Sequence, residues 1–166
     1  MVVVLAPGTP LADPASRATY VSGHVLEWRL GWLTWVAAAL SLLWFYLWWR
    51  RRVGAPAVVV AIAALGLVAD LTAELVLIAY LVTSPTFAFT LTGGIANGLY
   101  TIAGIGLTLA TRLTTLERAW AGAMWAAGIA LSIATFAEAH LATAVATAIL
   151  FALFCPWCLY LAVRLR

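Results

Sequence analysis

The stretch WRLGWLTWVAAALSLLWFYLWW, from Trp28 to Trp49, indicates the fold class of this chain. It contains a single charged residue, Arg29, and three arginines at positions 50–52 follow it directly. An α-helix needs about 20 apolar residues to cross the hydrocarbon core of a bilayer. Tryptophan, which stands near both ends of the stretch, favours the membrane interfaces. The stretch therefore predicts a transmembrane helix.

Four more stretches of this kind follow, and the links between them are too short to hold a soluble domain. The predicted spans are Trp28–Trp49, Ala57–Val82, Phe87–Ala110, Ala119–Ala137 and Leu141–Val163. The links are Arg50–Pro56, Thr83–Thr86, Thr111–Arg118 and Glu138–His140. Short links make successive helices antiparallel neighbours. Residues 28–166 are therefore predicted to form an all-α polytopic membrane bundle of five transmembrane helices.

The composition excludes most other classes of protein. Of the 166 residues, 66% are hydrophobic and 9% are charged, whereas a soluble domain has about 45–50% apolar and 25% charged residues. A soluble domain of this size cannot bury so much apolar surface, which excludes a soluble enzyme. The net charge is +3, but the arginines gather at the ends of apolar runs. This pattern indicates the lipid bilayer as a partner and gives no support to nucleic-acid binding.

Residues 1–27 are predicted to form an extracytoplasmic segment ahead of the first span. Asp13 and Pro14 are typical of a helix start. We expect residues 14–22 to form a short helix on the membrane surface, with Gly23 at the turn into the span; an unstructured tail is the alternative. The first residues lack the basic region of a signal peptide, so the first span is expected to be retained.

The arginines predict an orientation in the membrane. If five spans alternate, Arg17 and Arg29 fall on one side and all other arginines fall on the opposite side. That second group is Arg50, Arg51, Arg52, Arg112, Arg118, Arg164 and Arg166. Because positive charge marks the cytoplasmic side, the amino terminus is predicted to lie outside and the carboxyl terminus in the cytoplasm. A bacterial inner membrane is the expected location.

Small residues predict which helices pack most tightly. The last three spans carry many glycines and alanines, among them Gly93, Gly94, Gly98, Gly104, Gly106, Gly122, Gly128, Ala142, Ala144, Ala146 and Ala148. Helices in lipid associate where small residues let the backbones approach. We expect these three spans to form the core of the bundle and the first span to face lipid.

Two acidic residues inside the second span are the main candidate site. Asp70 and Glu74 are four residues apart and share one helix face. Counting about 1.5 Å per residue places Asn97 and Tyr100 of the third span at a similar depth, and Thr101 is a further candidate partner. An acid at a helix centre costs about 2.5–3.5 kcal/mol on insertion scales, and no arginine lies at that depth. Either these residues bind a proton or cation, or they form a polar clamp between the two helices.

Two further groups are candidate metal sites. His24, Glu27, Glu138 and His140 all fall at the predicted outer face and have donor types that zinc accepts, but they could equally be solvated rim residues. Cys155 and Cys158 lie in the last span around Pro156, where a thiol pair beside a kink suits a soft metal such as Cu(I). The alternative for the cysteines is two small buried apolar side chains.

The motif Cys155-Pro156-Trp157-Cys158 resembles the C-x-x-C of membrane thiol oxidoreductases such as the vitamin K epoxide reductase family. That family also uses a second, loop-borne cysteine pair, which this chain lacks. In gross architecture, five spans with an outside amino terminus and nine tryptophans, the chain resembles the tryptophan-rich sensory protein (translocator) family. The Pro-rich, Trp-containing first loop of that family is absent, and no ligand is carried over from it.

Three hypotheses for function follow, and none of them identifies a cofactor. The leading one is a small proton- or cation-dependent transporter or channel-like protein with its site at Asp70 and Glu74. The second is an accessory or scaffold subunit of a larger membrane complex, or of a homo-oligomer, in which a partner's basic residue pairs with the acids. The third is a membrane thiol redox or soft-metal protein that uses Cys155 and Cys158.

Overall fold

The computed structural model describes residues 8–9, 14–80 and 85–165, and within them it is helical and contains no strand. The elements are α2 (Pro14–Gly23), α3 (Val25–Val53), α4 (Ala57–Tyr80), α5 (Pro85–Phe89), the π-helix η2 (Thr90–Ala96), α6 (Asn97–Ala110), α7 (Thr115–Phe136) and α8 (His140–Arg164). Five helical segments, one of them the run of α5, η2 and α6, are long and apolar enough to cross a membrane. The all-α bundle with five such helices is confirmed.

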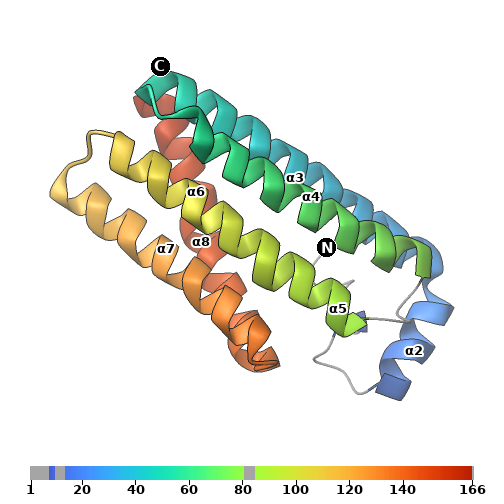
Figure 1. Ribbon diagram of the computed structural model, residues 1–166. Helices are drawn as coiled ribbons and strands as arrows, with labels where there is room; N and C mark the ends of the chain where they lie inside the picture. Colours follow the sequence, from blue (N-terminus) through green and yellow to red (C-terminus); the bar gives the residue numbers. More distant parts are fainter. Residues whose placement is uncertain (1–7, 10–13, 81–84, 166) are drawn as a thin grey trace.

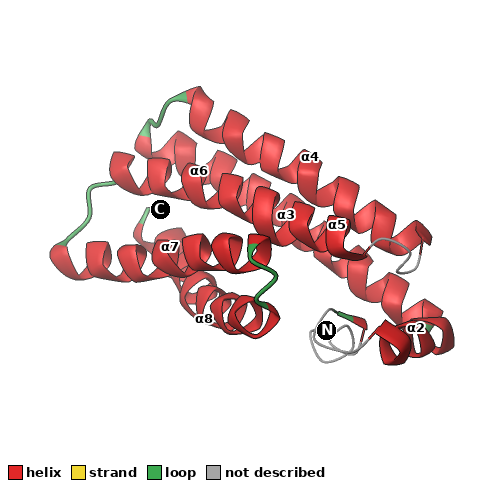
Figure 2. Ribbon diagram, turned by 60° about the horizontal axis from the view of Figure 1, so that its bottom comes forward, coloured by secondary structure: helices red, strands yellow, loops and turns green. Residues whose placement is uncertain are grey.

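The helices pack in the order α3, α4, α6, α7, α8, each against the next. Figure 1 shows α3 and α4 side by side, with α6 between α4 and α7. Figure 2 shows α7 and α8 as a pair beneath the other long helices. α8 meets α3 through aromatic rings, because Phe154 lies 6.1 Å from Phe45 and Trp157 lies 6.3 Å from Trp49 between ring centroids. The outward faces carry large apolar side chains, such as Leu109 at 81% exposure, as expected of a surface that faces lipid.

Two helix ends lie four residues from the predicted ones, and each has a local cause; α3 also begins three residues earlier than predicted, at Val25. α3 continues through the arginines 50–52, which suit the negative end of the helix dipole, and stops at Gly54 in the left-handed conformation. α7 begins four residues earlier than predicted, because Thr114 and Glu117 form a capping box. The α2 helix is present over Pro14–Gly23; the predicted cap at Asp13 lies outside the described residues.

The prediction that the last three spans form the core is wrong for the fifth. The most hydrophobic windows of the second and third spans are each 39% buried and that of the fourth is 33% buried, but α8 reaches only 17%. The alanines of α8 are two residues apart and therefore point in different directions around the helix, so that only Ala146 is buried. The first span, at 22%, is exposed as predicted.

Three of the tryptophans near the ends of the first span face inward rather than toward the lipid interface. Trp28 and Trp49 are fully buried and Trp32 nearly so. The indole N–H of Trp28 donates to the carbonyl of Leu77 at 2.9 Å, and that of Trp49 donates to the hydroxyl of Thr111 at 2.9 Å. These bonds hold one end of α3 against α4 and the other against the end of α6. They therefore fix the position of α3 beside the candidate site.

Candidate functional site

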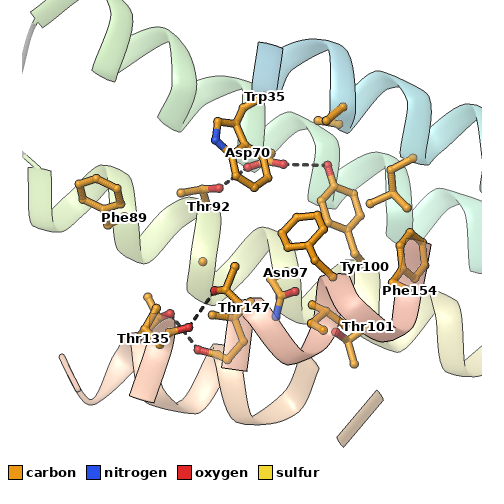
Figure 3. Close-up of a pocket in the computed structure, with 18 of the residues that line it drawn as sticks. Trp35, Asp70, Phe89, Thr92, Asn97, Tyr100, Thr101, Thr135, Thr147 and Phe154 are labelled. Atoms are coloured by element: carbon orange, nitrogen blue, oxygen red, sulfur yellow. Dashed lines mark hydrogen bonds between the residues drawn. The ribbon is translucent and has the colours of Figure 1, made fainter. Parts of the chain in front are cut away.

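Asp70 of α4 lies in the middle of the bundle and is held by two hydroxyl groups. It is 8% exposed. The Thr92 hydroxyl donates to its Oδ1 atom, and the Tyr100 hydroxyl donates to its Oδ2 atom at 3.3 Å, as the dashed lines in Figure 3 show. The predicted contact with Tyr100 is confirmed. Thr92 is a partner that the sequence reasoning missed.

The π-helix η2 explains how Thr92 and Tyr100 reach the same carboxylate. In a regular α-helix, two residues eight apart point about 80° away from each other, whereas two residues seven apart nearly align. In η2 the backbone N–H of Asn97 reaches the carbonyl of Thr92, five residues back, which inserts an extra residue into the turn. The eight-residue separation then acts like seven. The adjacent Gly93 and Gly94 were the only sequence signal of this irregular turn.

Glu74 lies one turn further along α4 and is more deeply buried than Asp70, at 1% exposure. Its Oε2 atom has no hydrogen-bond partner among the described residues. The adjacent Ala73 and the nearby Leu77 belong to a small apolar cluster with Trp28 and Trp32. An unpaired carboxyl oxygen in such surroundings is costly in free energy if the group is ionised, so this position favours a protonated acid.

Asp70 lines a cavity of about 840 Å³. It lies between α3, η2, α6, α7 and α8, and along α8 it extends from His140 to Cys158. Apolar and aromatic side chains make most of the wall, including Trp35, Phe89 and Phe154 (Figure 3). Two carboxylates line it, Asp70 in its depth and the exposed Glu138 on the α7–α8 link. Among the described residues that line it there is no arginine, and the chain has no lysine, so this cavity favours positive charge.

Asn97 and Thr101 line the same cavity but do not bind the acids, contrary to the prediction. The Asn97 side-chain amide donates to the carbonyl of Gly128 at 2.7 Å and to the hydroxyl of Ser132 at 2.9 Å, both on α7. Thr101 packs against Gly128, where an added Cβ would lie 2.4 Å from its hydroxyl oxygen. On a helix, Asn97 points about 60° and Thr101 about 100° away from Tyr100, in the same direction around the axis. Both side chains therefore face α7.

The predicted metal site of His24, Glu27, Glu138 and His140 is not assembled. No three His, Cys, Asp or Glu side chains in the described part of the chain are placed to hold a metal ion. The His24 ring stacks on Tyr20 at 4.5 Å between ring centroids, and its Nδ1 lies 3.0 Å from the Tyr20 carbonyl oxygen. Glu138 and His140 belong to the wall of the cavity instead. Similar depth in the membrane did not imply that the two pairs meet.

Both cysteines line the cavity, at the end away from His140. Cys155 is exposed and Cys158 half-buried, and both are free thiols. α8 continues as a helix from His140 to Arg164 through Pro156. The thiols are therefore accessible from the same space as Asp70.

Comparisons with protein-family models, with curated proteins and with solved structures found no match for this chain.

Proposed function

We propose that the protein is a small transporter that binds a proton or a cation at Asp70 inside the membrane. One observation carries this proposal: Asp70 lies in the wall of an apolar cavity of about 840 Å³ whose described lining contains no arginine. Acids within membrane spans are costly and are typically found on ion, proton or substrate pathways. Because no arginine or lysine among the described lining residues pairs with it, the carboxylate has a proton or an entering cation as its counter-charge.

The cavity suits an organic cation with an apolar body. Ligand pockets for small molecules commonly measure about 300–1,000 Å³, and this cavity lies within that range. Trp35, Phe89 and Phe154 offer aromatic faces that attract a cation and cover apolar groups. The positive group of the ligand would lie at Asp70, and its binding would displace the proton that the acid holds when the cavity is empty. That proton would leave the site for the aqueous phase, because Glu74, one turn away and buried with one oxygen unpaired, favours its own protonated form.

Transport in proteoliposomes tests the proposal. The purified full chain, with a pH gradient imposed, should take up the organic cation tetraphenylphosphonium. Asp70→Asn should lower the initial rate at least tenfold, because the neutral amide neither releases a proton nor balances the cation. Glu27→Gln is the matched control: it removes an exposed carboxylate that does not line the cavity, and it should keep the rate within about twofold.

Both variants must elute as the unmodified protein does in gel filtration and keep the same helical circular dichroism. If both variants meet these conditions, no uptake by the unmodified protein, or uptake by Asp70→Asn at the unmodified rate, would refute the transporter proposal.

We further propose the membrane orientation that the arginines predict, with the amino terminus outside the cell membrane.

A thiol site is a second candidate, because Cys155 and Cys158 line the same cavity as Asp70. If the pair is redox-active, mass spectrometry of acid-quenched samples should reveal an internal disulfide or a mixed disulfide at these positions. Cys155→Ser should abolish the mixed species, whereas Asp70→Asn should leave it. Thiols that stay free while the protein is active would exclude this second function.

A further inference from the structure

A second cavity, of about 390 Å³, lies at the end of the bundle where α3, α6 and α8 finish. Three arginines from distant parts of the sequence line it: Arg52 in the last turn of α3, Arg112 in the α6–α7 link and Arg164 in the last turn of α8. Their convergence confirms that these three chain segments reach the same end of the bundle, as the alternation of spans predicts.

Arg164 is fixed in place by its neighbours. Its Nε atom lies 3.0 Å from Glu117 Oε1, and one of its terminal nitrogens donates to the carbonyl of Arg112 at 2.7 Å. The second of these bonds holds the backbone of the α6–α7 link against the end of α8. These two interactions therefore hold one side of the cavity in place.

Among the described residues, the acidic side chains near this cavity do not balance its positive charge. Arg164–Glu117 is the one salt bridge between described side chains, and Glu117 is the one acid at this end in the described part of the chain. Arg52 and Arg112 are both exposed, and the Arg52 guanidinium lies 5.9 Å from the Trp48 ring centroid, which steadies it beside the cavity. Two of the three positive charges therefore have no acidic partner among the described side chains.

We propose that this cavity binds a phosphate group, with Arg52 and Arg112 as its principal ligands and Arg164 as a fixed third charge. Arginine binds phosphate through paired, charge-assisted hydrogen bonds. The cavity lies at the ends of membrane-spanning helices, which is the level of lipid headgroups, and basic pockets between such helices recognise anionic headgroups. The same phosphate chemistry could come from an anionic phospholipid or from a soluble phosphate. This site is separate from the cavity at Asp70 and does not depend on the transporter proposal.

Native mass spectrometry of the purified full chain tests the site. The protein is released from detergent in the presence of phosphatidylglycerol or of phosphatidylcholine with the same acyl chains. The unmodified protein should retain phosphatidylglycerol at least fivefold more than phosphatidylcholine. The double variant Arg52→Gln, Arg112→Gln should lose at least four-fifths of this preference. The matched control Arg51→Gln, Arg118→Gln removes two exposed arginines from the same end that do not line the cavity, and it should keep the preference.

A second arm separates the two sources of phosphate. If inorganic phosphate binds the unmodified protein, fails to bind the Arg52→Gln, Arg112→Gln variant and displaces phosphatidylglycerol, the site takes soluble phosphates as well. Phosphatidylglycerol retention that inorganic phosphate leaves unchanged assigns the site to lipid. No preference for phosphatidylglycerol together with no phosphate binding, or equal losses in the double variant and the control, would overturn the proposal. Because both variants remove two positive charges, general attraction between the protein and anions cannot explain a difference between them.

Discussion

Gly104 of α6 and Trp125 of α7 approach so closely that there is no room for a methyl group between them. A Cβ atom added at Gly104 would lie 2.2 Å from the Trp125 ring, which is fixed by a 2.9 Å hydrogen bond from its N–H to the Thr108 hydroxyl. Gly104→Ala should therefore destabilise the protein by about 1–3 kcal/mol, as overpacking does in other cores. Thermal unfolding in detergent measures the loss.

Gly122 on α7 is the control for that substitution, because an added Cβ would meet no atom within 4 Å. Gly122→Ala should leave stability unchanged or raise it by up to about 1 kcal/mol through helix propensity. Equal effects of the two substitutions would show that close packing at Trp125 does not govern the result.

At the scale of single residues, the sequence identified Asp70 because a carboxyl group in an apolar run is costly wherever it points. It identified Tyr100 by depth alone. Depth says nothing of direction around the helix, and so Asn97 and Thr101 were assigned to the acids although they face α7. In a regular helix Thr92 would point about 80° away from Tyr100, so the sequence did not indicate it as a partner of the same acid. The structure has the π-helix η2 at this place.

At the scale of elements, Glu117 joins the start of α7 to the end of α8. It accepts hydrogen bonds from the Tyr160 hydroxyl and, at 2.6 Å, from the backbone N–H of Thr114, and it pairs with Arg164. Glu117→Ala removes the capping box and this junction together. It should lower the free energy of unfolding by about 1–2 kcal/mol.

Thermal unfolding of Glu117→Ala beside Glu27→Ala checks this expectation, since Glu27 is an exposed acid in the first turn of α3. A fall in stability for Glu27→Ala as large as that for Glu117→Ala would contradict the role given to the junction. The sequence pattern Thr114-x-x-Glu117 could have located this helix start, and the apolar periodicity alone placed it four residues too late. The partners of Glu117 on α8 depend on tertiary packing, and no local pattern indicates them.

At the scale of the whole molecule, the alternation of five spans places Arg118 and Glu138 at opposite ends of α7. With Cys155 and Cys158 replaced by serine, Glu138→Cys should react with a membrane-impermeant maleimide in intact cells. Arg118→Cys should react only after the cells are permeabilised. Labelling of Arg118→Cys alone in intact cells would mean that the orientation is inverted, and equal labelling of both would mean that α7 does not cross the membrane.

The class of fold was predictable because each span satisfies the length and hydropathy of the bilayer by itself. The two cavities were not, because each is formed by side chains from several helices whose rotation and tilt depend on packing. The last helix is the clearest case. Its alanines predicted a central position, but it is the least buried of the five spans, and its residues from His140 to Cys158 line the cavity beside α3.

The measurement that bears most directly on the transporter proposal is carbodiimide modification of Asp70, followed by peptide mass spectrometry. Hydrophobic dicyclohexylcarbodiimide reaches carboxylic acids within the membrane, whereas a water-soluble carbodiimide reaches those in contact with bulk water. We predict that Asp70 reacts with the hydrophobic reagent and is protected by tetraphenylphosphonium, while exposed Glu138 reacts with the water-soluble one. If Asp70 reacts with the water-soluble reagent as fast as Glu138 does, and the organic cation gives no protection, the intramembrane cation site does not exist.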